Sequence, residues 1–202
     1  MAVFMFWNTK GAHLYDEIGI ICQEYDVDVA MFAESKLAPL PLLTALNLRG
    51  SRYFSEIPSA GTRIQFYTRY PLEWIEPRYD DRHASIRLLK HPIGGELLIV
   101  AVHLPSKLHQ KDEDQEFNVR NISDRISDQE SRIGHNRTMV IGDFNMDPFE
   151  NGMIVADGLH AVMDKNIAGI GDRRVGGKRY HLFYNPMWSR LGDDTIGPCG
   201  TY

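Results

Sequence analysis

The hydrophobic pattern at the start of the chain alternates between strand-like and helix-like spacing. Residues 2–8 (AVFMFWN) form a short apolar run that ends in Asn8, and residues 12–25 then repeat apolar side chains at helical spacing. A second apolar run, residues 28–35 (DVAMFAES), contains Glu34 near its end. The order strand, helix, strand is typical of two parallel strands joined by a crossover helix. Because both runs end in polar residues, we expect Asn8 and Glu34 to be neighbours.

The pattern changes over residues 52–103 to several short strand-like runs separated by proline and glycine turns. Such runs are typical of antiparallel sheet. The segment PIGG at 92–95 is a good hairpin connection, so we expect residues 84–91 (ASIRLLKH) and 96–103 (ELLIVAVH) to pair. The second of these strands places His103 at its end.

The rest of the chain predicts one long helix and several shorter elements. Residues 111–133 carry a sparse apolar stripe among many charges, which indicates a helix with a solvated face. A short helix is expected near 152–156, a strand near 159–163 and a loop at 169–179 (GIGDRRVGGKR). Because no segment has the composition of an interdomain linker, we expect a single domain over residues 1–202.

An acid and an amide stand two positions apart in the segment VIGDFNMDPFEN, residues 140–151. In extended backbone, successive side chains point to opposite faces, so Asp143 and Asn145 would share one face while Phe144 points to the other. The pattern therefore predicts two polar side chains that emerge together at a strand end. A simpler interpretation is that Asn145, with the Asp147 that follows it, builds a turn.

Composition and charge limit the possible functions. The chain is 43% hydrophobic and 24% charged, which is ordinary globular usage, and about 200 residues suit one large domain with a real core. The formal charge of −5 argues against a generally basic nucleic-acid binder. Any site for a polyanion must therefore be local.

Cysteine usage and the N-terminus predict a cytoplasmic protein without a membrane partner. Cys22 and Cys199 form neither a disulfide framework nor a CxxC motif, which fits a reducing compartment. Both are most simply interpreted as buried, small apolar residues. The first eight residues are too short to span a membrane and lack the charged start of a signal peptide.

Four apolar runs of the chain end in polar groups, and the motifs at these ends follow the order of a known superfamily. The motifs are FWNTKG, FAES, VAVHLPSK and VIGDFNMDPF. They resemble the endonuclease/exonuclease/phosphatase superfamily, the relatives of pancreatic-type deoxyribonuclease and abasic-site endonucleases, from residue 3 to about residue 150. The resemblance implies an α/β fold, a four-layer α/β/β/α sandwich of two mainly antiparallel mixed sheets.

The resemblance and the residue types together predict a metal-dependent phosphoester hydrolase. Glu34 offers a hard oxygen ligand and Asn8 a neutral one, which suit Mg²⁺ or Mn²⁺ better than Zn²⁺. The resemblance implies that Asp143 orients or activates the attacking water and that Asn145 donates an amide N–H to the phosphate. It also implies that His103 hydrogen-bonds the phosphate or protonates the leaving oxygen. Alone, each residue has a simpler interpretation as a turn former or a structural histidine.

Two weaker features of the sequence offer substrate contacts. Arg63 lies where members of the superfamily often carry a phosphate-facing residue, which makes it a candidate for substrate binding. Positive charge also gathers in the glycine-rich segment, at Arg173, Arg174, Lys178 and Arg179. These four residues either grip a backbone phosphate or are ordinary charges of an exposed loop. The partner that we expect is nucleic acid, DNA more than RNA.

One departure from the superfamily concerns the end of the chain. Members finish with a strand that carries an aspartate and then with an SDH-like motif, whereas this chain ends in GPCGTY, residues 197–202. His160 and His181 lack an adjacent acid, and GDD at 192–194 lacks a histidine. We therefore expect a C-terminally truncated domain without its last strands, or a divergent member. The alternatives to a nuclease are a phosphatase or phospholipase on the same fold, and a catalytically incomplete binding or regulatory module.

Overall fold

The computed structural model of the chain describes residues 2–48, 50–56, 61–107 and 111–190. The chain forms two compact units, of which the first comprises Met1–His103 with Arg137–Asp143 and the second Leu104–Asn136 with Phe144–Tyr202. Cys199 and the rest of the end segment 197–202 lie outside the described residues, as does the GDD segment at 192–194.

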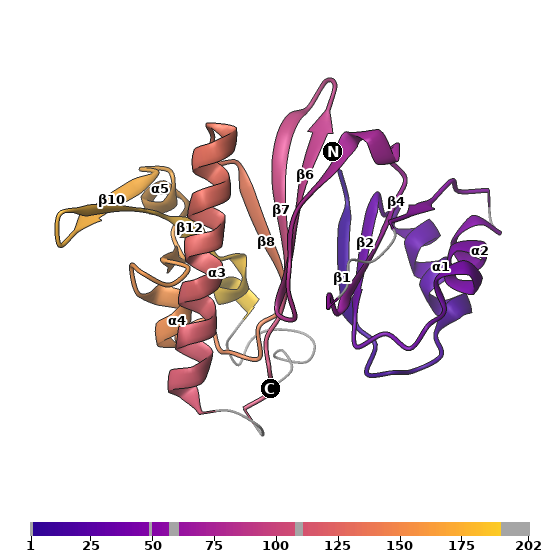
Figure 1. The fold of residues 1–202 in the computed structure, drawn as a ribbon, viewed down its shortest axis with the longest axis horizontal. Helices are drawn as coiled ribbons and strands as arrows, with labels where there is room; N and C mark the ends of the chain where they lie inside the picture. Colours follow the sequence, from indigo (N-terminus) through magenta and orange to yellow (C-terminus); the bar gives the residue numbers. More distant parts are fainter. Residues whose placement is uncertain (1, 49, 57–60, 108–110, 191–202) are drawn as a thin grey trace. The chain divides into compact units, whose positions relative to one another are not determined.

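The first sheet of the first unit has the strand order β1-β2-β4-β3. Its strands are β1 (Phe4–Asn8), β2 (Val29–Ala33), β3 (Phe54–Ser55) and β4 (Ile64–Thr68). β1 and β2 run parallel, with Asn8 opposite Ala33, whereas β4 is antiparallel to both β2 and β3. Helix α1 (Tyr15–Glu24) connects β1 to β2 and, with α2, covers one face of this sheet (Figure 1). The predicted strand–helix–strand unit is therefore confirmed, although its helix begins three residues later than residue 12.

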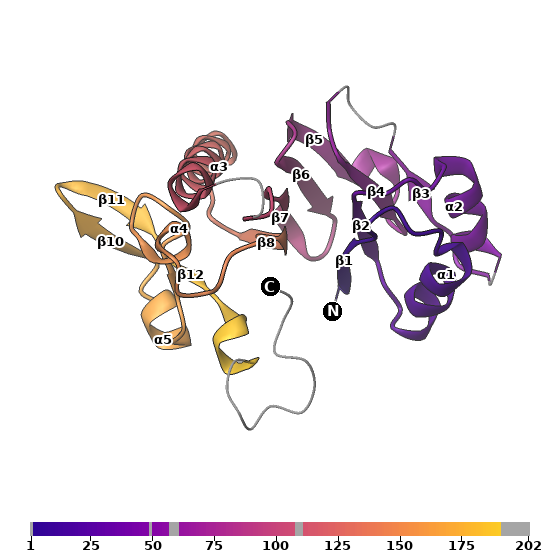
Figure 2. The ribbon, with the colours of Figure 1, turned by 90° about the horizontal axis from the view of Figure 1, so that it is seen from below.

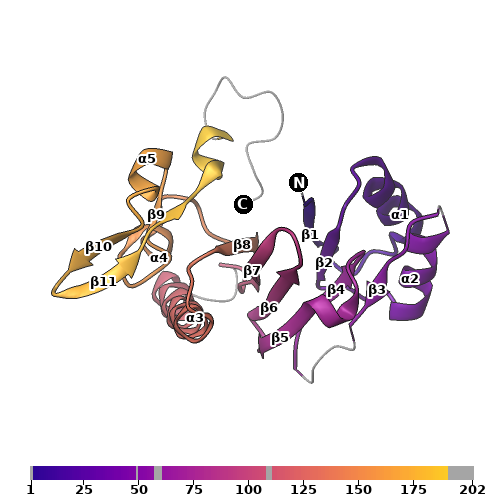
Figure 3. The same cartoon turned by 90° about the horizontal axis from the view of Figure 1, so that it is seen from above.

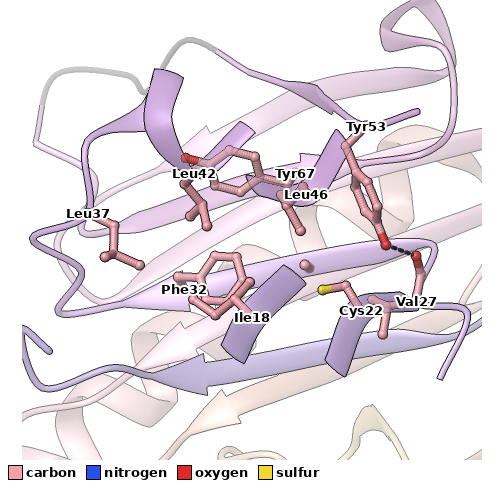
Figure 4. Packing of buried hydrophobic residues seen from close by; sticks show 10 residues of the cluster. Ile18, Cys22, Val27, Phe32, Leu37, Leu42, Leu46, Tyr53 and Tyr67 are labelled. Atoms are coloured by element: carbon pink, nitrogen blue, oxygen red, sulfur yellow. Dashed lines mark hydrogen bonds between the residues drawn. The ribbon is translucent and has the colours of Figure 1, made fainter. Parts of the chain in front are cut away.

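Helix α2 (Pro39–Asn47) was not predicted from the sequence, because two prolines interrupt its apolar pattern. Pro39 occupies the first position of the helix, where proline costs nothing since that N–H has no partner inside the helix. Leu42 and Leu46 lie four residues apart on one face of the helix, and both are buried. They pack with Phe32 in an apolar cluster (Figure 4). The cluster therefore joins α2 to the sheet.

Cys22 belongs to the same cluster, between α1 and the sheet (Figure 4). Its side chain is buried, and burial raises the pKa of the thiol to about 11, against a weaker opposing effect of a hydrogen bond with Tyr53. The Tyr53 hydroxyl donates to the carbonyl oxygen of Val27. The prediction that Cys22 is buried is thus confirmed.

The second sheet of the first unit has the order β5-β6-β7-β8 (Figure 2). The strands are β5 (Ile75–Asp80), β6 (Ala84–His91), β7 (Gly95–His103) and β8 (Thr138–Asp143), and a 3₁₀ turn, Leu72–Trp74, precedes β5. The predicted β6–β7 hairpin is confirmed, with His91 opposite Gly95. β7 and β8 are parallel, so each of the two sheets is mixed and mainly antiparallel, as expected. Apolar side chains from both sheets, including Met31, Phe66 and Ile99, form a shared core.

A buried ion-pair network lies within this unit, centred on Arg87 of β6. Its side chain is 2% exposed; Nε lies 2.6 Å from Glu56 Oε2 and Nη1 lies 3.0 Å from Asp80 Oδ1. The guanidinium also lies over the ring of Phe66, 4.9 Å from its centroid. Burial raises the pKa of the Glu56 carboxyl, and the neighbouring Arg87 opposes that rise. Because a buried charge without a partner is very costly, the three ionic groups depend on one another.

The second unit contains the long helix α3 (Asp112–Ile133) and several short elements. These are α4 (Asn151–Ile154), β9 (Ala161–Val162), α5 (Lys165–Ala168), β10 (Asp172–Val175), β11 (Lys178–His181), β12 (Phe183–Tyr184) and a 3₁₀ turn, Pro186–Arg190. The helix α3 and the short helix and strand after β8 agree with the sequence prediction. None of the helices within the described ranges is long and apolar enough to cross a membrane.

The sequence predicted a loop at 169–179, and this prediction is wrong. The segment forms the greater part of an antiparallel hairpin. β10 and β11 pair from Asp172 opposite His181 to Val175 opposite Lys178 (Figure 3). Gly176 and Gly177 form the tip with φ angles of +57° and +84°. Positive φ at both central residues is the requirement of a tight two-residue hairpin turn, which glycine meets without strain.

Candidate active site

Four polar side chains stand at strand ends of the first unit. Asn8 ends β1, His103 ends β7, Asp143 ends β8 and Glu34 follows the last residue of β2. In the two parallel pairs Asn8 lies opposite Ala33, and His103 lies opposite Asp143. Because parallel strands end at the same edge of a sheet, each pair brings its two polar residues to one edge. The expected neighbourhood of Asn8 and Glu34 is confirmed.

The amide nitrogen of Asn8 lies at the centre of this group. Asn8 Nδ2 donates to Glu34 Oε1 at 3.2 Å and to Asp143 Oδ2 at 3.0 Å. His103 Nε2 lies 3.4 Å from the same nitrogen and 3.0 Å from Glu34 Oε1. An amide has two hydrogens, and the two carboxylates account for both. Two acids, an amide and an imidazole from four strands thus form one connected cluster.

The turns after β1 and β2 hold the cluster in place through unusual backbone conformations. Lys10 and Glu34 both have φ of +47°, a region that residues other than glycine rarely adopt. Backbone contacts stabilise this arrangement: the Lys10 N–H donates to Asn8 Oδ1 at 3.0 Å, and the Gly11 N–H donates to the Glu34 carbonyl at 3.0 Å. Such conformations persist where the surrounding structure determines them, often at functional sites. Lys10 and Gly11 of the FWNTKG motif, to which the sequence pattern assigned no role, therefore help to position Asn8 and Glu34.

His103 is the most enclosed member of the cluster, whereas Glu34 is open to solvent. The side chain of His103 is 7% exposed and that of Glu34 is 47% exposed. The backbone N–H of His103 donates to the His83 carbonyl at 2.8 Å. Its second ring nitrogen, Nδ1, is buried and has no hydrogen-bond partner within the described part of the chain. The imidazole is therefore oriented by Glu34 through one nitrogen and keeps hydrogen-bonding capacity at the other.

The glycine that precedes Asp143 is required by the close approach of two strands. Gly142 lies opposite Val102 of β7, and a Cβ built at Gly142 would lie 2.0 Å from the Val102 carbonyl oxygen. Since that oxygen belongs to the backbone of a central strand, it cannot rotate away. The glycine of the GDFN motif thus permits the β7–β8 contact that brings Asp143 next to His103.

Gly142→Ala should therefore destabilise the protein by about 1–3 kcal/mol, the usual cost of forcing an extra methyl into a packed site. The strand end should also shift, so that any activity dependent on Asp143 falls with stability. Denaturant unfolding measures the change. Gly94→Ala is the matched control, because the nearest atoms to a Cβ there belong to the side chain of His91, at 3.3 Å and beyond. Equal stability of the two variants would show that the close approach at Gly142 is unimportant.

Asn145 differs from the expectation that it shares a strand face with Asp143. β8 ends at Asp143, and Asn145 has a φ of +49°, so the alternation of extended backbone does not reach it. Asn145 also belongs to the second compact unit. There its Nδ2 donates to the Leu104 carbonyl at 2.8 Å, and its own carbonyl accepts from Gln115 Nε2 at 3.1 Å. Its contact with a phosphate stays a prediction.

Arg63 lies at the same edge of the first sheet as Glu34. It immediately precedes β4, whose first residue, Ile64, pairs with Ala33. The side chain is exposed. Arg63 also contributes, less than burial does, to lowering the pKa of His83, the residue whose carbonyl binds the His103 N–H. The proposed substrate contact of Arg63 stays a prediction, although its place in the fold is compatible with it.

The donor atoms of the cluster are suited to a hard divalent cation. Within the described ranges, no group of three or more histidine, cysteine, aspartate or glutamate side chains is arranged to hold a metal ion. Mg²⁺, however, commonly binds one or two protein carboxylates and completes its shell with water and phosphate oxygens. Glu34 and Asp143 supply two carboxylates around one amide. Among the residues that the structure describes, the Lys10 N–H is the one donor to Asn8 Oδ1, which keeps a second lone pair. These oxygens fit Mg²⁺ or Mn²⁺ better than Zn²⁺.

Two mixed sheets packed on one core, with an acid–amide–histidine cluster at the strand ends, define an α/β fold of the phosphoesterase type. A family model described as the endonuclease/exonuclease/phosphatase family matches residues 5–193. The chain belongs to this family. The match extends well past residue 150, where the sequence motifs end, and includes most of the second unit.

One solved structure with a TM-score above 0.5 shows the same fold, and two others are similar at lower scores. A family protein from Bacteroides thetaiotaomicron has a TM-score of 0.54 and 13% identity, over 76% of this chain and 65% of that one. Truncated Caenorhabditis elegans TDP2 has a TM-score of 0.49 and 16% identity, over 73% of this chain and 63% of that one. The endonuclease domain of TRAS1, a telomere-specific non-LTR retrotransposon, has a TM-score of 0.49 and 15% identity, over 90% of this chain and 81% of that one. The chain thus spans less than two thirds of the first two structures. No curated protein matches it.

Proposed function

We propose that this protein is a divalent-metal-dependent phosphoester hydrolase, and that its substrate is the phosphodiester backbone of nucleic acid. The observation that carries the proposal is the convergence of Asn8, Glu34, His103 and Asp143 within hydrogen-bond distances at one edge of a fold of this family. Family membership gives the class of bond, and the cluster gives the groups that hydrolysis needs.

In this proposal each residue has a separate task. Asp143 orients or deprotonates the attacking water, and His103 donates to the phosphate or protonates the leaving oxygen. Asn145 donates an amide hydrogen to a phosphate oxygen. Glu34 and Asn8 would hold Mg²⁺ or Mn²⁺, which when bound supplies neutralisation of the phosphate charge.

The contact between His103 and Glu34 adds a constraint to this scheme. A neutral imidazole carries one proton, and Nε2 lies 3.0 Å from the Glu34 carboxylate. If Nε2 keeps that proton, Nδ1 can only accept a hydrogen bond. Donation to substrate through Nδ1 therefore requires a ring that carries a proton on both nitrogens.

Nucleic acid is preferred as the substrate because positive charge is concentrated locally in a chain that is acidic overall. The formal charge is −5, yet residues 172–181 contain four cations and one carboxylate. A polyanion would meet this segment favourably although the whole chain would repel it. DNA is the first choice over RNA.

Hydrolysis assays on the whole chain test the proposed function. Mg²⁺ or Mn²⁺ should support cleavage of plasmid DNA and of bis-p-nitrophenyl phosphate, both diesters, and excess EDTA should abolish it. p-Nitrophenyl phosphate, a monoester, should be a much poorer substrate. Preferential cleavage of the monoester would replace the nuclease with a phosphatase, and failure to cleave any of the three would contradict the hydrolase itself.

Glu34→Gln should weaken Mg²⁺ or Mn²⁺ binding by about 10-fold or more, because it replaces an ionised ligand with a neutral one of the same shape. Titration calorimetry measures the affinity without reference to activity, and it should be carried out up to high metal concentration. Glu17→Gln, an exposed position on α1, is the matched control and should bind metal as the parent does. An affinity unchanged in Glu34→Gln would remove this residue from the metal site.

A further inference from the structure

The β10–β11 hairpin of the second unit presents four cations on two short strands. They are Arg173, Arg174, Lys178 and Arg179. Arg174 lies directly opposite Arg179, and Lys178 lies opposite Val175. Because side chains alternate between faces, Arg174 and Arg179 share one face while Arg173 and Lys178 share the other. Both faces of the ribbon are therefore basic.

These cations are exposed and only weakly neutralised. All four are exposed, and the side chain of Arg179 is 68% accessible. Arg179 lies 3.6 Å from Asp172, itself 36% exposed, an ion pair of the kind that contributes little in water. Arg173 and Arg174 have no ion pair within the described ranges. Most of the positive charge on the hairpin is thus free to meet a ligand.

The base of the hairpin is fixed to the second unit. The Leu182 N–H donates to the Gly171 carbonyl at 2.9 Å, closing the ribbon just beyond its last strand pair. The carbonyl of His181 is 3.0 Å from His160 Nδ1, and the side chain of His160 is itself buried. Tyr180 meets the ring of the same histidine edge-on, with centroids 6.4 Å apart. A binding partner would therefore meet cations on a preorganised scaffold and not on a free loop.

The tip of the hairpin is narrow as well as exposed. Gly176 and Gly177 have no side chains, and a Cβ at either position would meet no atom within 4 Å. The two-stranded ribbon extends away from the short helices α4 and α5 of the same unit (Figure 3). A ribbon of this width is of the kind that the major groove of B-DNA admits.

We propose that the β10–β11 hairpin is a nucleic-acid-binding ribbon whose cations contact backbone phosphates. This inference rests on the proposed function for its choice of polyanion and names the surface that holds the substrate. Binding to phosphates through arginine and lysine on a ribbon is independent of base sequence. An anionic membrane is a poorer fit, because binding to a bilayer is strengthened by apolar side chains that insert into it, and Val175 is the only aliphatic residue in 172–181.

Salt-dependent DNA binding of the whole chain tests the proposal. Fluorescence anisotropy with a short labelled DNA duplex, in EDTA to prevent cleavage, gives the slope of log affinity against log salt concentration. The double variant Arg173→Gln with Arg174→Gln should bind more weakly and reduce the magnitude of the slope by about 1.8, or about 0.9 for each lost phosphate contact. Glutamine removes the charge but keeps part of the aliphatic stem and a hydrogen-bonding head, and the pairing of β10 with β11 is made by backbone groups, so the strand pairing should persist.

The matched control removes two exposed arginines from the same unit, Arg125→Gln with Arg132→Gln on α3. It changes the net charge equally and should leave the slope at the parent value. If the slope falls by the same amount in both double variants, net charge governs DNA binding and the hairpin does not, and the proposal is wrong. It is also overturned if the parent does not bind DNA at low salt, or if the hairpin variant loses only binding to vesicles of phosphatidylserine and phosphatidylcholine.

Hydrolysis distinguishes this proposal from the proposed function. On bis-p-nitrophenyl phosphate, which is too small to reach a separate surface, the hairpin variant should match the parent, whereas its kcat/KM on DNA should fall with its affinity. If the parent cleaves the small diester and the hairpin variant binds DNA as the parent does, the role of the hairpin in DNA binding is contradicted and the proposed function is not. If the parent binds DNA but cleaves none of the substrates, and the hairpin variant loses DNA binding, the ribbon is supported and the hydrolase is contradicted.

Discussion

Replacing Asp143 with asparagine should reduce kcat for phosphodiester hydrolysis by about 100-fold or more, with little change in stability. The carboxylate would serve as the base or orienting group for the attacking water, and an amide cannot accept the proton. Asp143 Oδ2 lies 3.0 Å from the Asn8 amide nitrogen, and an asparagine would place either an oxygen or a nitrogen there. Steady-state rates on bis-p-nitrophenyl phosphate and thermal unfolding of the same samples measure the two effects.

Asp16→Asn provides the control for Asp143→Asn, since it makes the same chemical change at an exposed position of α1. It should retain the rate of the parent. Full hydrolysis by Asp143→Asn would mean that this acid only builds a strand end, and it would remove the base from the mechanism. A large loss of stability in Asp143→Asn would instead assign the residue a structural role.

Replacing Arg87 with methionine should destabilise the protein by about 3–5 kcal/mol, the cost of removing one partner from a buried ion pair. Arg87 is 2% exposed, and its loss would leave the carboxylates of Glu56 and Asp80 buried together. Urea unfolding measures the loss at neutral pH. Lys90→Met, on the same strand, is the control: its pair with Glu76 is 48% and 38% exposed and should contribute at most about 1 kcal/mol.

The loss of unfolding free energy caused by Arg87→Met should become smaller as the pH falls from about pH 8 to about pH 5. Burial already raises the pKa of the Glu56 carboxyl, and removal of Arg87 removes the charge that opposes this rise. A carboxyl whose pKa is higher in the folded state binds more protons there than in the unfolded chain, so acid stabilises the folded variant relative to neutral pH. A deficit that grows on acidification would contradict the assignment of the loss to unpaired carboxylates.

Local pattern was sufficient for the elements that place the candidate site. The alternation of apolar runs predicted β1, α1 and β2, and the PIGG turn predicted the pairing of β6 with β7. Because parallel strands end at one edge, the polar ends of these runs could be expected to gather, and Asn8 does contact Glu34. These features depend on residues close in sequence or on the fixed geometry of strands, which a sequence carries directly.

Elements whose local signals conflict were decided by tertiary packing. The prolines of α2 concealed a helix that is stabilised by burying Leu42 and Leu46 against the sheet. The glycines at 176 and 177 indicated a loop, yet they are the turn residues of a hairpin whose strands pair on either side. A propensity is worth a few tenths of a kcal/mol per residue, whereas burial of one large apolar side chain is worth about 2 kcal/mol, so packing prevails where the two disagree.

The sequence by itself determined the family of this protein, the order of its central strands and the identity of the polar residues at their ends. Tertiary structure alone decided that His103 faces Glu34, that Gly142 must lack a side chain beneath Val102 and that Arg87 is buried between two acids. It also placed Asn145 beyond the end of β8, in a left-handed conformation that strand alternation does not describe. Most of these contacts join residues tens of positions apart, and their geometry depends on how strands pair and sheets pack, which no local pattern of hydrophobic and polar residues specifies.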